Sequence, residues 1–269
     1  MTHVIVHAGF HKTGTSSLQD YLRAHRARLA DRVTIYLKDD FLDAGNAARR
    51  YGMRPHPWRL WRFRRALRDF LNAIPEAPVI FLSWEGFSGV MPGHRRPLSG
   101  PVRGMARAAV PLARGIVAEL RHRFGPAARI EFLYTLREGE SWLRSVWGHI
   151  ARSIRLTEDY PAFRAGFPTL TPLDAEAATV ARAIAPVPVH TAWLEEISAL
   201  PQGPATSALR LMGFSDAEIA ALPRASHVNR GNSDAATQTF LHLNRTLADP
   251  AELKQRKDAL ARDDHRNRP

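Results

Sequence analysis

The sequence predicts a three-layer α/β fold in which a central parallel sheet is flanked by helices. Three observations indicate it. A β-branched run at residues 4–6 passes through a glycine-containing loop into a helical pattern that begins at Thr15. Two longer apolar runs, at residues 78–83 and 129–136, are typical of parallel strands that are buried on both faces. Helical segments follow these strands, as parallel connections require.

The loop after the first strand, residues 9–16 (the Lys12 loop), carries the clearest chemistry. Gly9 and Gly14 free the backbone, Lys12 lies between them, and the loop also carries three hydroxyl side chains. The helix that follows adds unpaired amides. The spacing is P-loop-like, but Thr15 stands where a nucleotide-triphosphate P-loop has its lysine. The loop therefore predicts a site for a phosphate-like anion.

Residues 7–16, HAGFHKTGTS, resemble the phosphosulfate loop of the sulfotransferases that use 3′-phosphoadenosine-5′-phosphosulfate. The bacterial branch of that family shows the form H-x-G-x-H-K-T-G-T-[ST]. The resemblance implies that Lys12 stabilises the bridging oxygen as the nucleotide leaves, and that no metal ion is needed. It also implies a set of residues that hold the 5′-phosphate, namely Thr13, Gly14, Thr15 and Ser16 together with Lys12. His11 could serve as an oxyanion donor or a second base.

The next segment alternates strand and helix. A strand is predicted at residues 33–37, a loop at 38–57 and a helix at 58–74. On that helix, four arginines lie mostly outside the apolar stripe and are interpreted as a solvated face: Arg59, Arg62, Arg65 and Arg68.

The strand at residues 78–83 brings Glu85 to its carboxyl end, the edge at which open α/β sheets bind ligands. Glu85 is therefore expected near the Lys12 loop if the two strands are neighbours. Some members of the resembled family use a glutamate in this position as the base, and others use a histidine. Glu85 is a candidate base, and a structural carboxylate that pairs with an arginine or a helix N-terminus is the alternative.

A surface loop at residues 91–101 and a helix at 105–124 lead to the strand at 129–136. Arg137 follows that strand, and Ser145 lies eight residues later in the next helix. The resemblance extends to this spacing, which belongs to the family's 3′-phosphate element, and it implies that both residues hold the 3′-phosphate. Two acids, Glu138 and Glu140, depart from the family pattern.

The last third of the chain is predicted as short elements: a loop-rich stretch at 156–173, a helix at 174–185, an edge strand at 187–190, short helices over 193–222 and a helix capped by Ser233 or Asp234. The resemblance makes Arg230 and Gly231, in a basic loop before that helix, candidates for covering the 3′-phosphate and adenine. A loop of this kind also suits any helix N-cap.

Length and composition limit the remaining possibilities. The 269 residues suit one α/β domain, taken as residues 1–248, with a charged C-terminal helix and tail at 249–269. The net charge is +12 and only four of the 38 basic residues are lysines, so arginine-rich binding of anions is expected. The chain has no cysteine, which excludes disulfides, thiolate metal sites and cysteine nucleophiles. No apolar window approaches a membrane span, and a cytoplasmic protein is expected.

These observations combine into one expected function, a metal-independent sulfotransferase that acts on a hydroxyl or amine of a small-molecule, carbohydrate or lipid acceptor. Two alternatives remain open. A small-molecule P-loop kinase would use the same strand, loop and helix with ATP and Mg²⁺, although the displaced lysine argues against it. A non-catalytic nucleic-acid-binding protein would explain the charge, but the chain has no recognised binding motif, and nucleic acid is not the expected partner.

Overall fold

The structure is a computed structural model that describes residues 1–96, 100–225 and 231–266. The chain divides into two compact units. The first comprises residues 1–138 and 171–229, and the second comprises residues 139–170 and 230–269. The parallel sheet belongs to the first unit, and the described part of the second unit folds into four helices.

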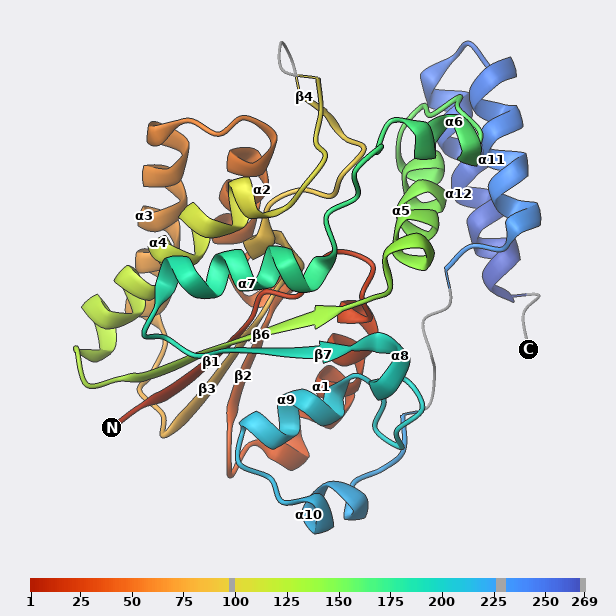
Figure 1. The fold of residues 1–269 in the computed structure, drawn as a ribbon. Coiled ribbons are helices and arrows are strands. Elements are labelled where there is room, and N and C mark those ends of the chain that lie inside the picture. Colours follow the sequence, from red (N-terminus) through yellow and green to blue (C-terminus); the bar gives the residue numbers. More distant parts are fainter. Residues whose placement is uncertain (97–99, 226–230, 267–269) are drawn as a thin grey trace. The chain divides into compact units, whose positions relative to one another are not determined.

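Five parallel strands form the sheet of the first unit, in the order β2-β3-β1-β6-β7 (Figure 1). The strands are β1 (His3–His7), β2 (Thr34–Leu37), β3 (Val79–Ser83), β6 (Arg129–Leu136) and β7 (Val189–Trp193). β1 lies at the centre, and its Val4, Ile5 and Val6 are fully buried, as expected for a strand covered on both faces. The sheet and its helices confirm the predicted three-layer α/β fold.

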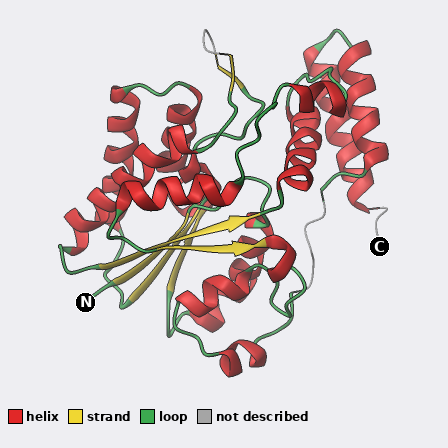
Figure 2. Ribbon diagram, viewed as in Figure 1, coloured by secondary structure: helices red, strands yellow, loops and turns green. Residues whose placement is uncertain are grey.

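Helices cover both faces of this sheet (Figure 2). One layer consists of α1 (Thr15–Leu29), α8 (Leu194–Ile197), α9 (Ala205–Leu211) and α10 (Asp216–Ala221). Leu18 and Leu22 of α1 share a buried cluster there with Ile5 and Phe81 of the sheet. The other layer consists of α2 (Leu42–Met53), α3 (Pro57–Ala73), α4 (Ala106–Phe124) and α7 (Leu173–Ile184). The chain leaves β1 toward the first layer and β3 toward the second, so these neighbours form a topological switch point, where open α/β sheets bind ligands.

The predicted elements agree with the structure except in three segments. The loop predicted at residues 38–57 is wrong, because the structure has a 3-10 turn, η1 (Lys38–Phe41), followed by α2. Residues 91–101, predicted as a loop, include two short antiparallel strands, β4 (Arg95–Arg96) and β5 (Gly100–Pro101). The loop-rich stretch at 156–173 contains a short helix, α6 (Tyr160–Ala165), which Asp159 caps by accepting a hydrogen bond from the Ala162 amide at 3.0 Å.

The missed helix α2 has a physical explanation. Its packing face is made of small residues, and Ala44, Gly45 and Ala48 are all buried. A Cβ added at Gly45 would lie 0.8 Å from Cζ3 of Trp84, so the indole ring rests directly on the helix backbone. A helix that packs through glycine and alanine lacks the large apolar side chains by which helical periodicity is recognised.

Gly45→Ala tests this contact. Alanine is a better helix former than glycine by about 1 kcal/mol, so the change should stabilise a helix that has room for a methyl group. At Gly45 we expect a loss of about 1–3 kcal/mol in the free energy of unfolding, because the Trp84 ring must move. Chemical denaturation measures the change. Gly148→Ala is the matched control, since its new Cβ would meet Thr237 Oγ1 at an ordinary 3.4 Å. A Gly45→Ala protein at least as stable as wild type would contradict the packing argument.

The second unit consists of α5 (Gly139–Ser153), α6, α11 (Asp234–Thr246) and α12 (Pro250–Arg266). Of the two predicted caps, Ser233 is the one that caps α11, because its hydroxyl accepts a hydrogen bond from the Ala236 amide at 3.0 Å. Residues 250–266 of the segment predicted as a charged helix and tail form α12, whose Lys257 is buried. The Lys257 ammonium donates to Ile154 O at 2.9 Å and to Asn244 Oδ1 at 2.8 Å, and burial lowers its pKa to about 8. Lys257 therefore ties α12 to the neighbouring helices of this unit.

Two further findings concern side chains and helix length. Ile154, which follows the end of α5, is 37% exposed. Among the helices of the described ranges, none combines the length and the hydropathy that crossing a bilayer requires.

Candidate functional site

The Lys12 loop joins β1 to α1 at the carboxyl end of the central strand. Two of its residues adopt left-handed backbone conformations, Lys12 with φ 67° and Gly14 with φ 90°. Gly14 is the N-cap of α1, and within the described structure no side chain caps this helix and no acidic residue lies in its first turn. The helix N-terminus therefore presents amides and partial positive charge beside Lys12.

The threonine hydroxyls of the loop are turned inward. Thr13 is fully buried, and its hydroxyl donates to Phe10 O at 2.6 Å and is hydrogen-bonded to Thr135 Oγ1 at 2.7 Å. Thr15 is also buried, with its hydroxyl 3.5 Å from Phe10 O, whereas Ser16 is exposed. Thr13 and Thr15 would thus act on an anion through their backbone amides, while their side chains hold the shape of the loop.

His7 lies beneath the loop, where it is fully buried. Its Nδ1 is hydrogen-bonded to Ser83 Oγ at 2.8 Å, and its Nε2 to Thr135 Oγ1 at 3.3 Å. A Cβ at Gly9 would fall 2.4 Å from His7 Nε2 and 2.6 Å from Thr135 Oγ1. The loop backbone therefore passes directly over this imidazole, and Gly9 is required for this close approach.

Burial lowers the pKa of His7 to about 3, so the ring is neutral in the folded protein. In the unfolded chain the ring binds a proton near its ordinary pKa of 6.5. Between these two values the unfolded state holds more protons, and stability must therefore fall as the pH is lowered. The contribution of one such site approaches about 1.4 kcal/mol per pH unit.

We therefore expect His7→Gln to flatten the pH dependence of the free energy of unfolding below pH 6.5, whatever its effect on stability at neutral pH. Urea denaturation at a series of pH values measures this slope. His122→Gln is the control, because His122 is exposed, and it should keep the wild-type slope. Equal slopes for the two variants would show that His7 is not the buried neutral group described.

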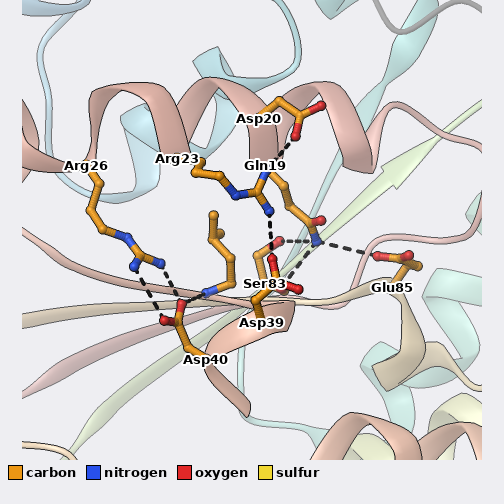
Figure 3. Close-up of polar contacts among 9 residues, drawn as sticks. Gln19, Asp20, Arg23, Arg26, Asp39, Asp40, Ser83 and Glu85 are labelled. Carbon is orange, nitrogen blue, oxygen red and sulfur yellow. Dashed lines mark hydrogen bonds and ion pairs between the residues drawn. The ribbon is translucent and has the colours of Figure 1, made fainter. Parts of the chain in front are cut away.

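Glu85 opens the short turn η2 (Glu85–Ser88) after β3 and is half-buried. The side-chain amide of Gln19 donates to Glu85 Oε2 at 3.4 Å, and it also lies 3.2 Å from both Ser83 O and Ser83 Oγ (Figure 3). Gln19 reaches these groups from α1, where it is buried. Hydrogen bonds thus connect His7, Ser83, Gln19 and Glu85, so the carboxylate is oriented by groups from β1, β3 and α1.

Figure 3 also shows two ion-pair groups that join α1 to the turn η1. Arg23 contacts Asp20 at 2.5 Å and Asp39 at 3.3 Å, and Arg26 contacts Asp40 at 2.5 Å. These side chains are largely solvent-exposed, and surface pairs of this kind contribute little stability. They belong to the packing of the first unit rather than to its chemistry.

His11 donates from Nε2 to the Gly89 carbonyl at 3.1 Å, which leaves Nδ1 as the acceptor nitrogen of the neutral ring. Burial lowers the pKa of His11. The Glu85 carboxylate and the Gly89 carbonyl oppose this shift, whereas the Lys12 and Arg49 cations reinforce it. Burial also lowers the pKa of His94, with His11 and Arg49 adding to the effect. The structure therefore gathers these five charged or titratable side chains: His11, Lys12, Arg49, Glu85 and His94.

Arg137 follows β6, the neighbour of β1, and its Nη1 lies 3.5 Å from the carbonyl oxygen of Lys12. Burial lowers the pKa of Arg137, while Glu195 and Glu138 oppose the shift. The guanidinium is therefore beside the Lys12 loop within the first unit, where a second anionic group of a ligand could bind it.

Three other predicted site residues are not part of the site described above. Ser145 lies on α5 of the second unit, and its pairing with Arg137 stays a prediction. Arg230 falls outside the described residues, and Gly231 is exposed. Of the two acids that depart from the family pattern, Glu140 accepts hydrogen bonds from the Tyr160 hydroxyl and from Arg164 Nε, the latter at 3.0 Å.

Gln19, Arg49 and His94 were not predicted as site residues. Gln19 had one detectable signal, since it is a polar residue on the helix face that buries Leu18 and Leu22. Arg49 lay in the segment mistaken for a loop. Within the three described ranges, no group of His, Asp and Glu side chains is disposed to hold a metal ion.

Comparison of the chain with protein-family models, with curated proteins and with solved structures found no match. A function is therefore to be inferred from the chemistry of the Lys12 loop and its neighbours.

Proposed function

We propose that the protein transfers a sulfuryl group from 3′-phosphoadenosine-5′-phosphosulfate to a hydroxyl or amine of an acceptor. The observation that carries the proposal is the Lys12 loop, with Lys12 and the amides of the α1 N-terminus together at the carboxyl end of the central strand. The match of residues 7–16 to the phosphosulfate loop supports the same assignment. Sulfuryl transfer requires this kind of cation and amide arrangement around a singly charged group.

The reaction is an in-line displacement at sulfur. The acceptor oxygen or nitrogen forms its bond to sulfur as the bond from sulfur to the bridging oxygen breaks. The electron pair of the broken bond stays on the bridging oxygen of 3′-phosphoadenosine 5′-phosphate, and the acceptor proton passes to a base. Lys12 stabilises the charge that grows on the bridging oxygen, and the amides of residues 13–16 hold the 5′-phosphate.

Glu85 is the first candidate for the base, because its carboxylate lies at the carboxyl end of β3 and is an electrostatic neighbour of His11. Gln19 orients it through the hydrogen bond to Oε2. His11 is the second candidate, since its Nδ1 is an acceptor in the neutral ring and its lowered pKa keeps it neutral. Arg137 supplies a positive charge for the 3′-phosphate.

Nucleotide binding provides the first test. We expect 3′-phosphoadenosine 5′-phosphate to raise the melting temperature without added metal, and far more than AMP does, because Arg137 binds the extra phosphate. Arg137→Ala should weaken binding by about 1.5–3 kcal/mol, the scale of a lost hydrogen bond to a charged group. Thermal shift and calorimetric titration measure both effects.

The comparison includes ATP with Mg²⁺ and a DNA oligonucleotide. Equal affinity for 3′-phosphoadenosine 5′-phosphate and AMP would remove the role of Arg137. Tighter binding of ATP with Mg²⁺ would favour a small-molecule kinase, and tighter binding of DNA would favour a nucleic-acid-binding protein. Arg28→Gln, which removes one charge from an exposed position on α1, is the control for nonspecific attraction.

A further inference from the structure

A groove lies on the outer side of α2 and α3, within the first unit, and plays no part in the proposed reaction. Its volume is about 420 Å³. It is lined by Asp43, Ala47, Arg50, Trp58, Arg59, Trp61, Arg62, Arg65, Ala66 and Asp69. Ala44 and Ala48 on the other side of α2 are buried, so the lining residues of α2 face away from the core. The size is in the range of pockets that bind small organic ligands.

Two exposed indoles are the main apolar surface of the groove. Trp58 is 47% exposed and Trp61 is 59% exposed, although tryptophan is normally well buried. They stand three residues apart on α3 and therefore on the same side of the helix. Exposed tryptophans that gather on one face indicate a surface that binds a partner.

Guanidinium groups surround these indoles. Arg59 and Arg62 lie 5.0 Å and 5.8 Å from the ring centroid of Trp58, and Arg65 lies 5.6 Å from that of Trp61. Such cation–π contacts hold both the rings and the charges in place. The groove thus combines two partly exposed indole rings with positive charges that lie over them.

The net charge of the residues that line the groove favours an anionic ligand. Four arginines and two aspartates line the groove, so the lining is net positive. Arg59 donates to the carbonyl of Arg50 at 2.8 Å, and Arg65 lies 4.0 Å from Asp69. In the described part of the chain, no ion pair with a carboxylate engages Arg50 or Arg62. Their guanidiniums can therefore bind an anionic group in the forked geometry that suits sulfate and carboxylate.

We propose that this groove binds an anionic oligosaccharide of two or three sugar rings. The C–H face of a pyranose ring is apolar and packs flat against an indole, so Trp58 and Trp61 can each receive one ring. Arg50 and Arg62 bind the sulfate or carboxylate groups. Asp43 and Asp69 accept hydrogen bonds from the hydroxyl groups of the sugar. A ligand that offers only phosphate groups has no such donors for these two carboxylates.

The lining of the groove also favours a saccharide over two other anionic partners, a single-stranded nucleic acid and a bilayer surface. A single-stranded nucleic acid stacks its bases on aromatic rings, but its backbone requires a groove that is positive along its length, whereas two carboxylates interrupt this one. A bilayer surface needs a projecting apolar face, and here the indoles border a hollow. No residue of the Lys12 loop takes part, so binding in this groove does not depend on the proposed sulfuryl transfer.

The test is a calorimetric titration of the full chain at about 0.15 M salt, where long-range attraction is screened. The probes are a chondroitin sulfate hexasaccharide, its desulfated and carboxyl-reduced counterpart, an oligodeoxythymidylate of equal charge, and vesicles that contain phosphatidylserine. The indole N–H signals of Trp58 and Trp61, assigned with tryptophan-to-phenylalanine variants, report the place of binding.

We expect the charged hexasaccharide to bind and to shift both indole signals. Trp58→Ala and Arg62→Gln should each weaken binding by about tenfold or more, whereas Trp58→Phe, which keeps an aromatic face, should lose only about threefold. Arg28→Gln removes the same charge from an exposed position on α1 and should leave the affinity unchanged.

Four results would overturn the proposal: no binding of the hexasaccharide, equal binding of its uncharged counterpart, an equal loss in Arg28→Gln, or tighter Trp58-dependent binding of the oligodeoxythymidylate or the vesicles. Circular dichroism of each variant confirms that it is folded. Loss of nucleotide binding at the Lys12 loop would not affect this test, so the two proposals fail separately.

Discussion

Lys12→Ala is expected to lower the single-turnover rate of sulfuryl transfer by about a hundredfold to a thousandfold, the scale of losing one group that stabilises a developing oxyanion. The affinity for 3′-phosphoadenosine 5′-phosphate should fall by a smaller factor, because charge on the bridging oxygen grows during transfer. Rapid-quench measurement of transfer and calorimetry of product binding, on one preparation, separate the two quantities.

Two variants make the Lys12 result specific. Lys12→Arg keeps the positive charge and should retain part of the rate, while its backbone still has to adopt the left-handed conformation at φ 67°. Lys38→Ala removes an exposed lysine in the turn η1 and should leave the rate unchanged. Normal transfer by Lys12→Ala would end the proposed mechanism.

Glu85→Gln is expected to reduce transfer by about a hundredfold to ten-thousandfold if Glu85 is the base, because the amide is nearly isosteric but cannot take a proton. Nucleotide affinity should be kept. The amide oxygen can still accept the hydrogen bond from Gln19, which lies 3.4 Å from Glu85 Oε2, so the local structure should also be kept. Single-turnover transfer, nucleotide binding and melting temperature are measured together.

A structural role predicts a different result. In that case Glu85→Gln would lower the melting temperature, and the remaining activity would follow the fraction of folded protein. Glu76→Gln, which changes an exposed carboxylate that pairs with Arg123, is the control for the substitution itself. Near-normal transfer by Glu85→Gln would move the base to His11, and His11→Gln should then show the large loss.

Local sequence patterns predicted the elements that carry large apolar side chains. The runs at residues 78–83 and 129–136 correspond to β3 and β6, and the helix predicted at 58–74 corresponds to α3. β3 and β6 are continuous, mostly apolar runs of buried side chains, and α3 buries one apolar stripe, so a short window of sequence contains the necessary information. α2 was missed because its packing face is glycine and alanine, and the partner that makes Gly45 suitable is Trp84, which lies in another segment.

The candidate site was likewise predicted only where its residues are adjacent in the chain. The composition of the Lys12 loop predicted an anion site because Lys12, Gly14 and the start of a helix are adjacent in the chain. The hydrogen bond of Gln19 to Glu85 and the electrostatic interaction of His94 with His11 could not be predicted, since these interactions join separate segments. The groove of α2 and α3 was also missed, because four arginines on one helix could equally form a solvated face.

By itself, the sequence determined the α/β class and the strand, loop and helix around Lys12, because strand and helix periodicity and glycine conformation are local properties of the chain. Only the tertiary structure decided that β1 lies between β3 and β6. That arrangement brings His7 to Ser83 and Thr135, which are 76 and 128 residues away along the chain. Hydrogen bonds across such separations depend on which strands are neighbours, and strand order is set by packing of the whole sheet rather than by any one segment.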